Sequence, residues 1–304
     1  MPNATPGSVV AFADATPAPL APWAPGRLAA LLRRDPVAAV ATATLVVIGL
    51  AALLAPVIAP FDPAQALNIA AGAQPPSADH WLGTDSVSRD LLSRLLFGAR
   101  ISLGISVIAV TVAMVVGTAW GAAAGYAGGW IDRVLMHLVD AGLAIPRILL
   151  LLGIVALWGS LSMTSLVLLI GLTGWFGASR LVRAEVRATR ERDFAIAARA
   201  SGASPLRVLV RHVLPHAMTP MLVAATLGVG QVVVIEAGLS FLGYGVAPPT
   251  ASWGSLIREG RQALGTAWWM SVFPGVALAA TVLAINVLGD RLRAALGGQQ
   301  LHAQ

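Results

Sequence analysis

The sequence contains neither cysteine nor lysine, and these two absences exclude several kinds of chemistry. Without cysteine there are no disulfides, thiolate metal ligands or thiol nucleophiles. All 20 basic residues are arginine, which excludes a lysine Schiff base. The phosphate-binding motif G-x-x-x-x-G-K-[ST] is excluded too, because its lysine is missing. If the protein works with ATP, another chain must bind the nucleotide.

Charge is also scarce. Only 11% of the 304 residues are charged, whereas soluble proteins have about 25%. Hydrophobic residues make up 57% of the chain, and the mean hydropathy is +0.78. The composition predicts an all-α integral membrane protein. The five histidines are scattered, so neither a metal site nor a catalytic constellation is expected.

Six apolar stretches reach the length of about 20 residues that a helix needs to cross a bilayer. They cover roughly 37–59, 101–125, 134–157, 161–180, 217–243 and 269–289. The predicted organisation is a disordered Pro-rich tail (1–36), a first span (37–60), an outer loop with an amphipathic helix (61–100), a five-helix core (101–292) that includes the loop 181–216, and a C-terminal tail (293–304). Thr84 or Asp85 is the expected cap of the amphipathic helix.

The isoelectric point of ≈ 11.3 is compatible with nucleic-acid binding, but the arginines gather at the ends of the apolar stretches. Arginine in these places marks the cytoplasmic side of a membrane protein. We therefore expect both termini and the loop 181–216 in the cytoplasm, the lipid bilayer as surroundings, and no nucleic-acid partner.

The second stretch carries glycines at every fourth position, Gly117, Gly121 and Gly125. Glycines four apart share one helix face and let another backbone approach closely. The partner is either a helix of the same chain or a second membrane subunit.

Carboxylates inside the spans are costly unless they are paired or wet. Asp140 lies near the cytoplasmic end of the third stretch, and Glu236 lies near the outer end of the fifth. Glu236 either pairs with Arg258 or Arg261 or, together with Gln231, lines a translocation pathway.

The cytoplasmic loop holds the segment "DFAIAARASGASPLRVLVRHVLP" (193–215). Its first helix is expected to present a face of small residues, and Gly202 is expected to end that helix. Ser204 and Pro205 suit the start of a second helix, whose apolar face would be Leu206, Leu209, Val210 and Val213. Such a pair of helices either docks into a groove on another protein or lies on anionic lipid.

The pattern A-A-x-x-x-G, followed by nine residues and "HVLP", resembles the cytoplasmic EAA loop of ABC-importer permeases. Ala197, Ala198, Gly202, Leu214 and Pro215 match, but Ile196 stands where the motif has glutamate. Four more segments resemble the C-type permease of peptide and nickel importers: "HWLGTDSVSRDLLSRLLFGARISL" (80–103), "GGWIDRVLMHLVDAGLAIPRILL" (128–150), "LSFLGYGVAPPTASWGSLIREGR" (239–261) and "WWMSVFPGVALAATVLAINVLGDRLRAAL" (268–296).

The resemblance implies a type I ABC importer permease of MetI-like fold in the bacterial inner membrane. It also implies a second, B-type permease, two ATPase subunits that bind ATP and Mg, and an extracytoplasmic solute-binding protein. The implied ATPase-contact residues are Phe194, Ala197, Ala198, Gly202, Ala203, Ser204, Leu214 and Pro215. The implied cargo is a peptide, with glutathione and nickel chelates as alternatives. An ATP-independent secondary transporter is the competing class, but it would need a polar relay or inverted repeats.

Overall fold

The computed structural model describes residues 32–66, 71–159 and 162–297, whose regular structure is helical apart from one isolated β-bridge. The helices are α2 (Pro36–Ile58), α3 (Leu91–Ala127), α4 (Gly129–Ala144), α5 (Arg147–Trp158), α6 (Met163–Arg190), α7 (Asp193–Ala200), α8 (Pro205–Val208), α9 (Leu214–Phe241), α10 (Trp253–Arg261) and α11 (Trp269–Gly297). A π-helical turn, Leu209–Val213, joins α8 to α9. The predicted tails lie outside the described residues up to residue 31 and from residue 298 onwards.

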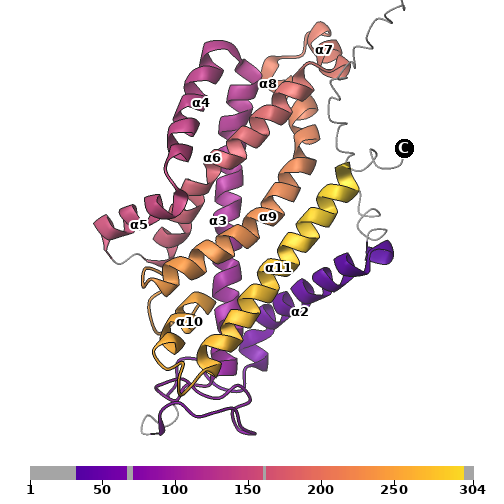
Figure 1. Ribbon diagram of the computed structural model, residues 1–304. Coiled ribbons are helices and arrows are strands. Elements are labelled where there is room, and N and C mark those ends of the chain that lie inside the picture. The colour runs from indigo at the N-terminus through magenta and orange to yellow at the C-terminus, as the bar shows by residue number, and fades with distance from the viewer. Residues whose placement is uncertain (1–31, 67–70, 160–161, 298–304) are drawn as a thin grey trace, which may run out of the picture.

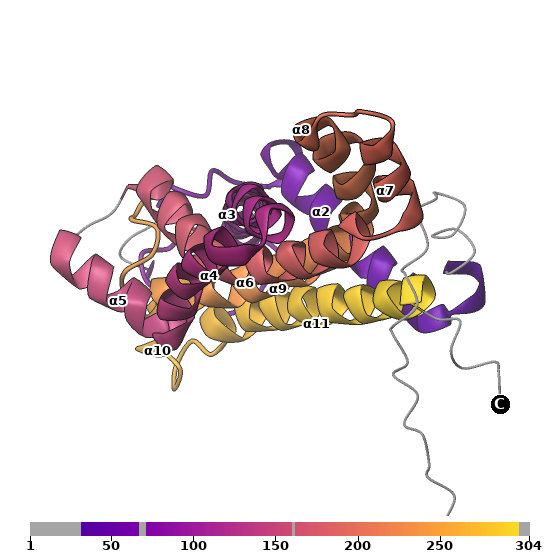
Figure 2. The same ribbon diagram turned by 90° about the horizontal axis from the view of Figure 1, so that it is seen from above.

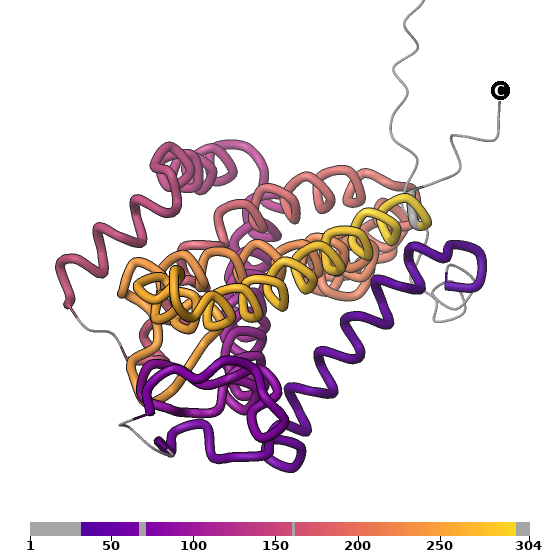
Figure 3. The backbone as a smooth tube through the Cα atoms, turned by 60° about the horizontal axis from the view of Figure 1, so that its bottom comes forward, coloured from indigo at the N-terminus to yellow at the C-terminus, as the bar shows by residue number. Residues whose placement is uncertain are grey.

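Helix α3 is the central element of the fold. It runs the length of the molecule in Figure 1, where it packs along α6 and also against α9 and α2. Helix α11 packs on α9 and α2, and Figures 2 and 3 show α5 projecting on the side opposite to α2. With 37 residues, α3 is roughly 55 Å long, which exceeds the hydrocarbon thickness of about 30 Å. Its ends therefore reach beyond the membrane interior.

Within the described residues, five helical segments are long and apolar enough to cross a membrane, and the pair α4–α5 makes a sixth if it is counted as one broken span. The continuous helix predicted over 134–157 is wrong, because α4 and α5 meet at a bend of 80°. Pro146 is the physical reason, since a proline ring disfavours the helical conformation of the residue before it. Ile145 is accordingly extended, with a ψ of 126°.

The amphipathic stretch of the outer loop also differs from the prediction. Neither Thr84 nor Asp85 caps a helix; α3 begins at Leu91 with Asp90 as its N-cap. Leu91, Leu92 and Leu95, expected in a separate amphipathic helix, thus belong to the first turns of α3, whereas Val87 lies in the turn before it. Asp85 is fully buried instead, and its carboxylate pairs with Arg94 at 2.5 Å.

Arg94 joins the start of α3 to α10. Its Nη1 and Nη2 donate to the two carboxylate oxygens of Glu259, at 2.6 and 3.1 Å. The guanidinium is 1% exposed and so lies buried between Glu259 and Asp85. This network fastens α10 to the start of α3 at the lower end of the molecule in Figure 1, whereas α7 and α8 lie at the opposite end. We call these the α10 end and the α7 end.

Candidate functional site

Two short helices, α7 and α8, form the segment 193–208 at the α7 end (Figure 1). Gly202 makes the turn between them with a φ of +82°, a backbone conformation that glycine adopts without strain. Ser204 is the N-cap residue of α8 and Pro205 its first residue, as predicted, although the Ser204 side chain makes no capping hydrogen bond. The segment is thus two helices with a sharp turn, continued through the π-helical turn into α9.

This segment packs against the membrane helices through a small apolar cluster. Ala195, Val208 and Val213 are fully buried against Val182 and Val186 of α6. In addition, the ring of Phe194 stacks on His216 in the first turn of α9, with ring centroids 4.6 Å apart. Helix α7 is therefore packed against both α6 and α9.

The outward surface of the segment differs in part from the predicted faces. Ala197 is exposed as expected, but Ala198 packs inward with Phe194. The apolar face predicted for the second helix is split, since Val213 is buried whereas Leu206 and Val210 are 70% and 55% exposed. The π-helical turn is the reason, because its wider winding breaks the 3.6-residue period on which the prediction rested.

Of the remaining residues predicted to contact an ATPase, some are exposed and others pack against the apolar cluster. Gly202, Ser204 and Pro215 are exposed, whereas Ala203 and Leu214 are half-buried against the apolar cluster. Ile196, at the motif's glutamate position, is 48% exposed. The outward surface of 193–210 therefore combines Ile196, Ala197, Leu206 and Val210 with polar backbone around Gly202.

Arginines connect the segment to the neighbouring helix ends. Arg190 Nη1 donates to the carbonyl oxygens of Gly125 and Tyr126, at 2.9 and 2.8 Å, and so caps the last turn of α3. Arg199 donates in turn to the carbonyl oxygen of Arg190, at 3.0 Å. The arginine-rich loop thus has a structural role in addition to marking topology.

The glycine ladder packs within the chain, against α6. A Cβ atom at Gly117 would lie 2.6 Å from Ala178 Cβ, and one at Gly121 would lie 2.3 Å from the carbonyl oxygen of Ser179. At Gly125 the nearest atom would be the carbonyl oxygen of Arg183, at 2.8 Å. The second membrane subunit is therefore not the partner of this face.

Glu236 is fully buried, and the predicted pairing with Arg258 or Arg261 is wrong. Its carboxylate accepts hydrogen bonds from the hydroxyls of Ser240, at 2.6 Å, and Ser102, at 3.1 Å. Ser102 Oγ also accepts from the backbone N–H of Trp253, the first residue of α10. Glu236 thus joins α9 to α3 beside α10, and it lines neither of the two cavities that Gln231 lines.

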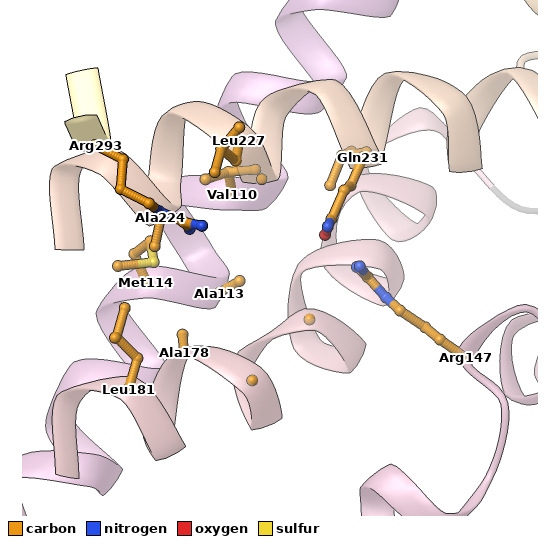
Figure 4. A pocket seen from close by; sticks show the side chains of 14 residues that line it. Val110, Ala113, Met114, Arg147, Ala178, Leu181, Ala224, Leu227, Gln231 and Arg293 are labelled. Carbon is orange, nitrogen blue, oxygen red and sulfur yellow. The ribbon is translucent and has the colours of Figure 1, made fainter. Parts of the chain in front are cut away.

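Gln231, by contrast, lines a cavity of ≈ 260 Å³ between α3, α6, α9 and α11. The side chain of Arg147 enters the same cavity, and Figure 4 shows the ends of Gln231 and Arg147 pointing toward each other. Arg293 points in from another side. The polar groups of this cavity are therefore amide and guanidinium groups.

Arg147 was not among the expected site residues, although it lies inside the predicted span 134–157. An ionisable residue within an apolar stretch is itself a signal of function. Asp140 pairs with Arg180 at 2.5 Å, and both side chains are about half exposed. Among the described residues, no group of three or more His, Cys, Asp or Glu side chains is placed to hold a metal ion.

Known proteins with similar sequences are permeases of transport systems. Residues 117–298 match the family model of the binding-protein-dependent transport system inner membrane component, and residues 26–76 match the N-terminal TM domain of oligopeptide transport permease C. The chain is 41% identical over 223 residues to the dipeptide transport system permease protein DppC of Alkalihalophilus pseudofirmus, with 73% of each chain covered. It is 38% identical over 264 residues to the glutathione transport system permease protein GsiD of Escherichia coli O6:K15:H31, with 87% of each covered.

Among solved structures, an inward-facing conformation of the MetNI methionine ABC transporter matches with a TM-score of 0.54. The sequence identity is 20%, and the match covers 66% of this chain and 95% of the other. This likeness confirms the predicted fold, an all-α membrane protein of MetI-like architecture.

Proposed function

The chain belongs to the family of binding-protein-dependent transport system inner membrane components, and from that premise we propose that it is the C-type permease subunit of an ATP-driven ABC importer for peptides. It is a multi-pass transport subunit, and no enzymatic step is assigned to it. The proposed partners are a B-type permease, two ATP-binding subunits and an extracytoplasmic solute-binding protein. The proposed location is the bacterial inner membrane, with both termini and the α7 end in the cytoplasm.

The outward surface of 193–210 is the observation that carries this proposal. Ile196, Leu206 and Val210 are exposed beside a cluster of arginines that marks a membrane–water boundary. Large apolar side chains that are exposed to water indicate an interaction surface. Because these residues stand on a clamped two-helix projection, they suit a groove on an ATPase subunit. Ile196 replaces the glutamate of the motif, so the proposed contact at this position is apolar rather than ionic.

The attachment of the segment supports a mechanical role. The buried Ala195–Val186 cluster links it to α6, and the Phe194–His216 stack links it to α9. Packed elements move as units rather than deforming continuously, so closure of the ATPases would tilt α6 and α9 together. These two helices carry most of the residues that line the cavity of ≈ 260 Å³ beside Gln231. Movement at the α7 end is thus connected to the proposed path of the solute.

The ATPases must supply the nucleotide site, because this chain lacks the lysine of a phosphate-binding loop. ATP and Mg are therefore proposed to bind to the partner subunits only. Dipeptides or short peptides are the proposed cargo, since the relatives include a dipeptide permease and a glutathione permease. Import of nickel chelates by the same machinery is the alternative cargo.

Replacement of Leu206 by aspartate tests the docking surface. Leu206 is 70% exposed, so the substitution should leave the fold intact while placing a charge in the proposed apolar contact. We expect copurification with the ATPase subunits and peptide uptake to fall at least about tenfold, as for the loss of a well-buried interface side chain. Leu264→Asp is the matched control, because Leu264 is 49% exposed in the turn after α10, at the opposite end.

The control should keep its ATPase subunits. Normal ATPase copurification of the Leu206→Asp variant would contradict the docking proposal. Uptake that persists in the complete absence of ATPase subunits would favour the secondary transporter instead.

A further inference from the structure

Arg147 carries a charge that no carboxylate of the described residues neutralises. It is the first residue of α5, directly after the bend at Pro146. Its Nη2 donates to the carbonyl oxygen of Ile170 at 2.6 Å, and its Nε donates to Thr173 Oγ1 at 3.5 Å. None of the ion pairs formed within the described ranges involves Arg147. A guanidinium has five N–H donors, so most of them stay available to another acceptor.

The free donors face two adjoining cavities. The cavity of ≈ 260 Å³ and a second one of ≈ 280 Å³ share Arg147, Gly174, Gly177 and Gln231 in their linings. A Cβ atom at Gly174 would lie 2.8 Å from Arg147 Nη2, so the glycine makes room for the guanidinium. The amide end of Gln231 faces it (Figure 4). Arg147 thus stands at the junction between the two spaces.

The linings of both cavities carry charge of one sign. Of the described residues that line them, Arg147 and Arg293 are cationic and none is Asp or Glu. An unneutralised cation in the membrane interior is costly, and a carboxylate from outside the chain would remove that cost. The planar fork of arginine fits a carboxylate through two parallel hydrogen bonds. Gln231 can donate a further bond from its amide nitrogen.

We propose that Arg147, assisted by Gln231, binds the carboxylate of the solute in transit, so that this permease favours solutes with a free carboxylate. The inference rests on the proposed function, because it takes the two cavities as part of an import path. It assigns to the permease a share of the selectivity that would otherwise belong to the binding protein alone.

The first experiment measures the charge of the cavity and does not depend on transport. A single cysteine at Gly177 lines both cavities, its Cβ has no atom within 4 Å, and this chain has no native cysteine. In the purified complete importer, its reaction rates with an anionic and a cationic methanethiosulfonate reagent of equal size are compared. Arg147→Gln should lower the anionic-to-cationic rate ratio on the order of fivefold, the Coulomb effect of one nearby charge.

Two further variants keep this measurement interpretable. Arg147→Lys retains the charge and should retain most of the ratio. Arg261→Gln, on α10 beside Phe241, removes an arginine far from the cavities and should leave the ratio unchanged. An unchanged ratio in Arg147→Gln, with the complex intact, would overturn the proposal.

The second experiment measures selectivity in proteoliposomes that contain the complete importer and its binding protein. Uptake of a dipeptide is compared with uptake of the same dipeptide amidated at its C-terminus. The binding protein is identical for all variants, so a change in the acid-to-amide ratio reports on the permease. Arg147→Gln should lower that ratio at least about tenfold, as expected when hydrogen bonds between two charged groups are lost.

The two failures are distinguishable. Equal loss of acid and amide uptake would assign Arg147 a packing role only and would overturn the carboxylate site. Absence of peptide uptake in the unmodified importer would overturn the proposed function instead, while the labelling ratio would still decide whether Arg147 makes the cavity attractive to anions.

Discussion

Arg94, Arg190 and Arg147 are the same residue type in three different environments. Arg94 is buried between two carboxylates, one of them on α10, 165 residues further along the chain. Arg190 caps the last turn of α3, and within the described part of the chain Arg147 has only a carbonyl and a hydroxyl group for partners. The distribution of arginine along the sequence was enough to predict an orientation. It could not identify these partners, because they come together only when distant helices pack.

At Gly121, too, the sequence left the packing partner undetermined, although it marked the residue as a site of close helix packing. The spacing of the ladder predicted a close approach of helices but left open whether the partner was inside the chain. Gly121→Leu should destabilise the folded chain by at least about 1–3 kcal/mol, because overpacking forces neighbouring atoms apart. The Cβ alone would lie 2.3 Å from a backbone oxygen of α6.

The measurement for Gly121 is thermal stability of the detergent-solubilised chain, followed by size-exclusion chromatography. Gly104→Leu on the same helix is the control, since no atom lies within 4 Å of its Cβ. Equal melting of the two variants would show that α3 and α6 do not pack at Gly121.

Among the elements, the apolar spans were predictable because hydropathy averages over a whole membrane thickness. The same averaging hides a break of two residues, so the bend between α4 and α5 was missed. Proline alone does not reveal it, since Pro56, Pro220 and Pro274 lie inside α2, α9 and α11 without ending them. The π-helical turn before α9 likewise leaves no mark in the apolar pattern, and the exposed Leu206 of α8 and Val210 of the turn were for that reason placed on one face with the buried Val213.

The turn between α7 and α8 gives a prediction about the coupling element. Gly202 has a φ of +82°, and a Cβ atom added there would have no other atom within 4 Å, so conformation rather than space limits substitution. Gly202→Val should strain the turn by roughly 1–2 kcal/mol or more, because β-branched residues avoid this backbone region. Asparagine, which is similar in size, tolerates it much better.

We therefore expect Gly202→Val to lower peptide uptake and ATPase copurification, and Gly202→Asn to keep most of both. The comparison is made in membranes with matched expression of the two variants. Equal activity of both would show that the shape of this turn does not matter for coupling.

At the scale of the whole molecule, the two ends differ in a way that suits a directional transporter. The α10 end is cross-linked by the buried ion pairs of Arg94, whereas the α7 end exposes Leu206 and Val210 on a two-helix projection. The cavities beside Arg147 lie along the helices that connect the ends. Hydropathy and arginine placement predicted which end faces the cytoplasm, and that orientation stays a prediction. The cavities depend on how α3, α6 and α9 pack and had no counterpart in the sequence pattern.

The polarity can be tested by labelling in intact cells. Single cysteines at Ser86 and Thr250 lie on exposed positions of the α10 end, and one at Ser204 is exposed at the α7 end. If the positive-inside rule holds for this chain, an impermeant thiol reagent added outside should modify the cysteines at Ser86 and Thr250 but not the one at Ser204. Permeabilised cells should allow all three to react, which controls for accessibility.

The chain without added cysteine provides the background, because it has no thiol of its own. Labelling of the Ser204 position from outside would reverse the orientation and would remove the docking surface from the side where ATP is available.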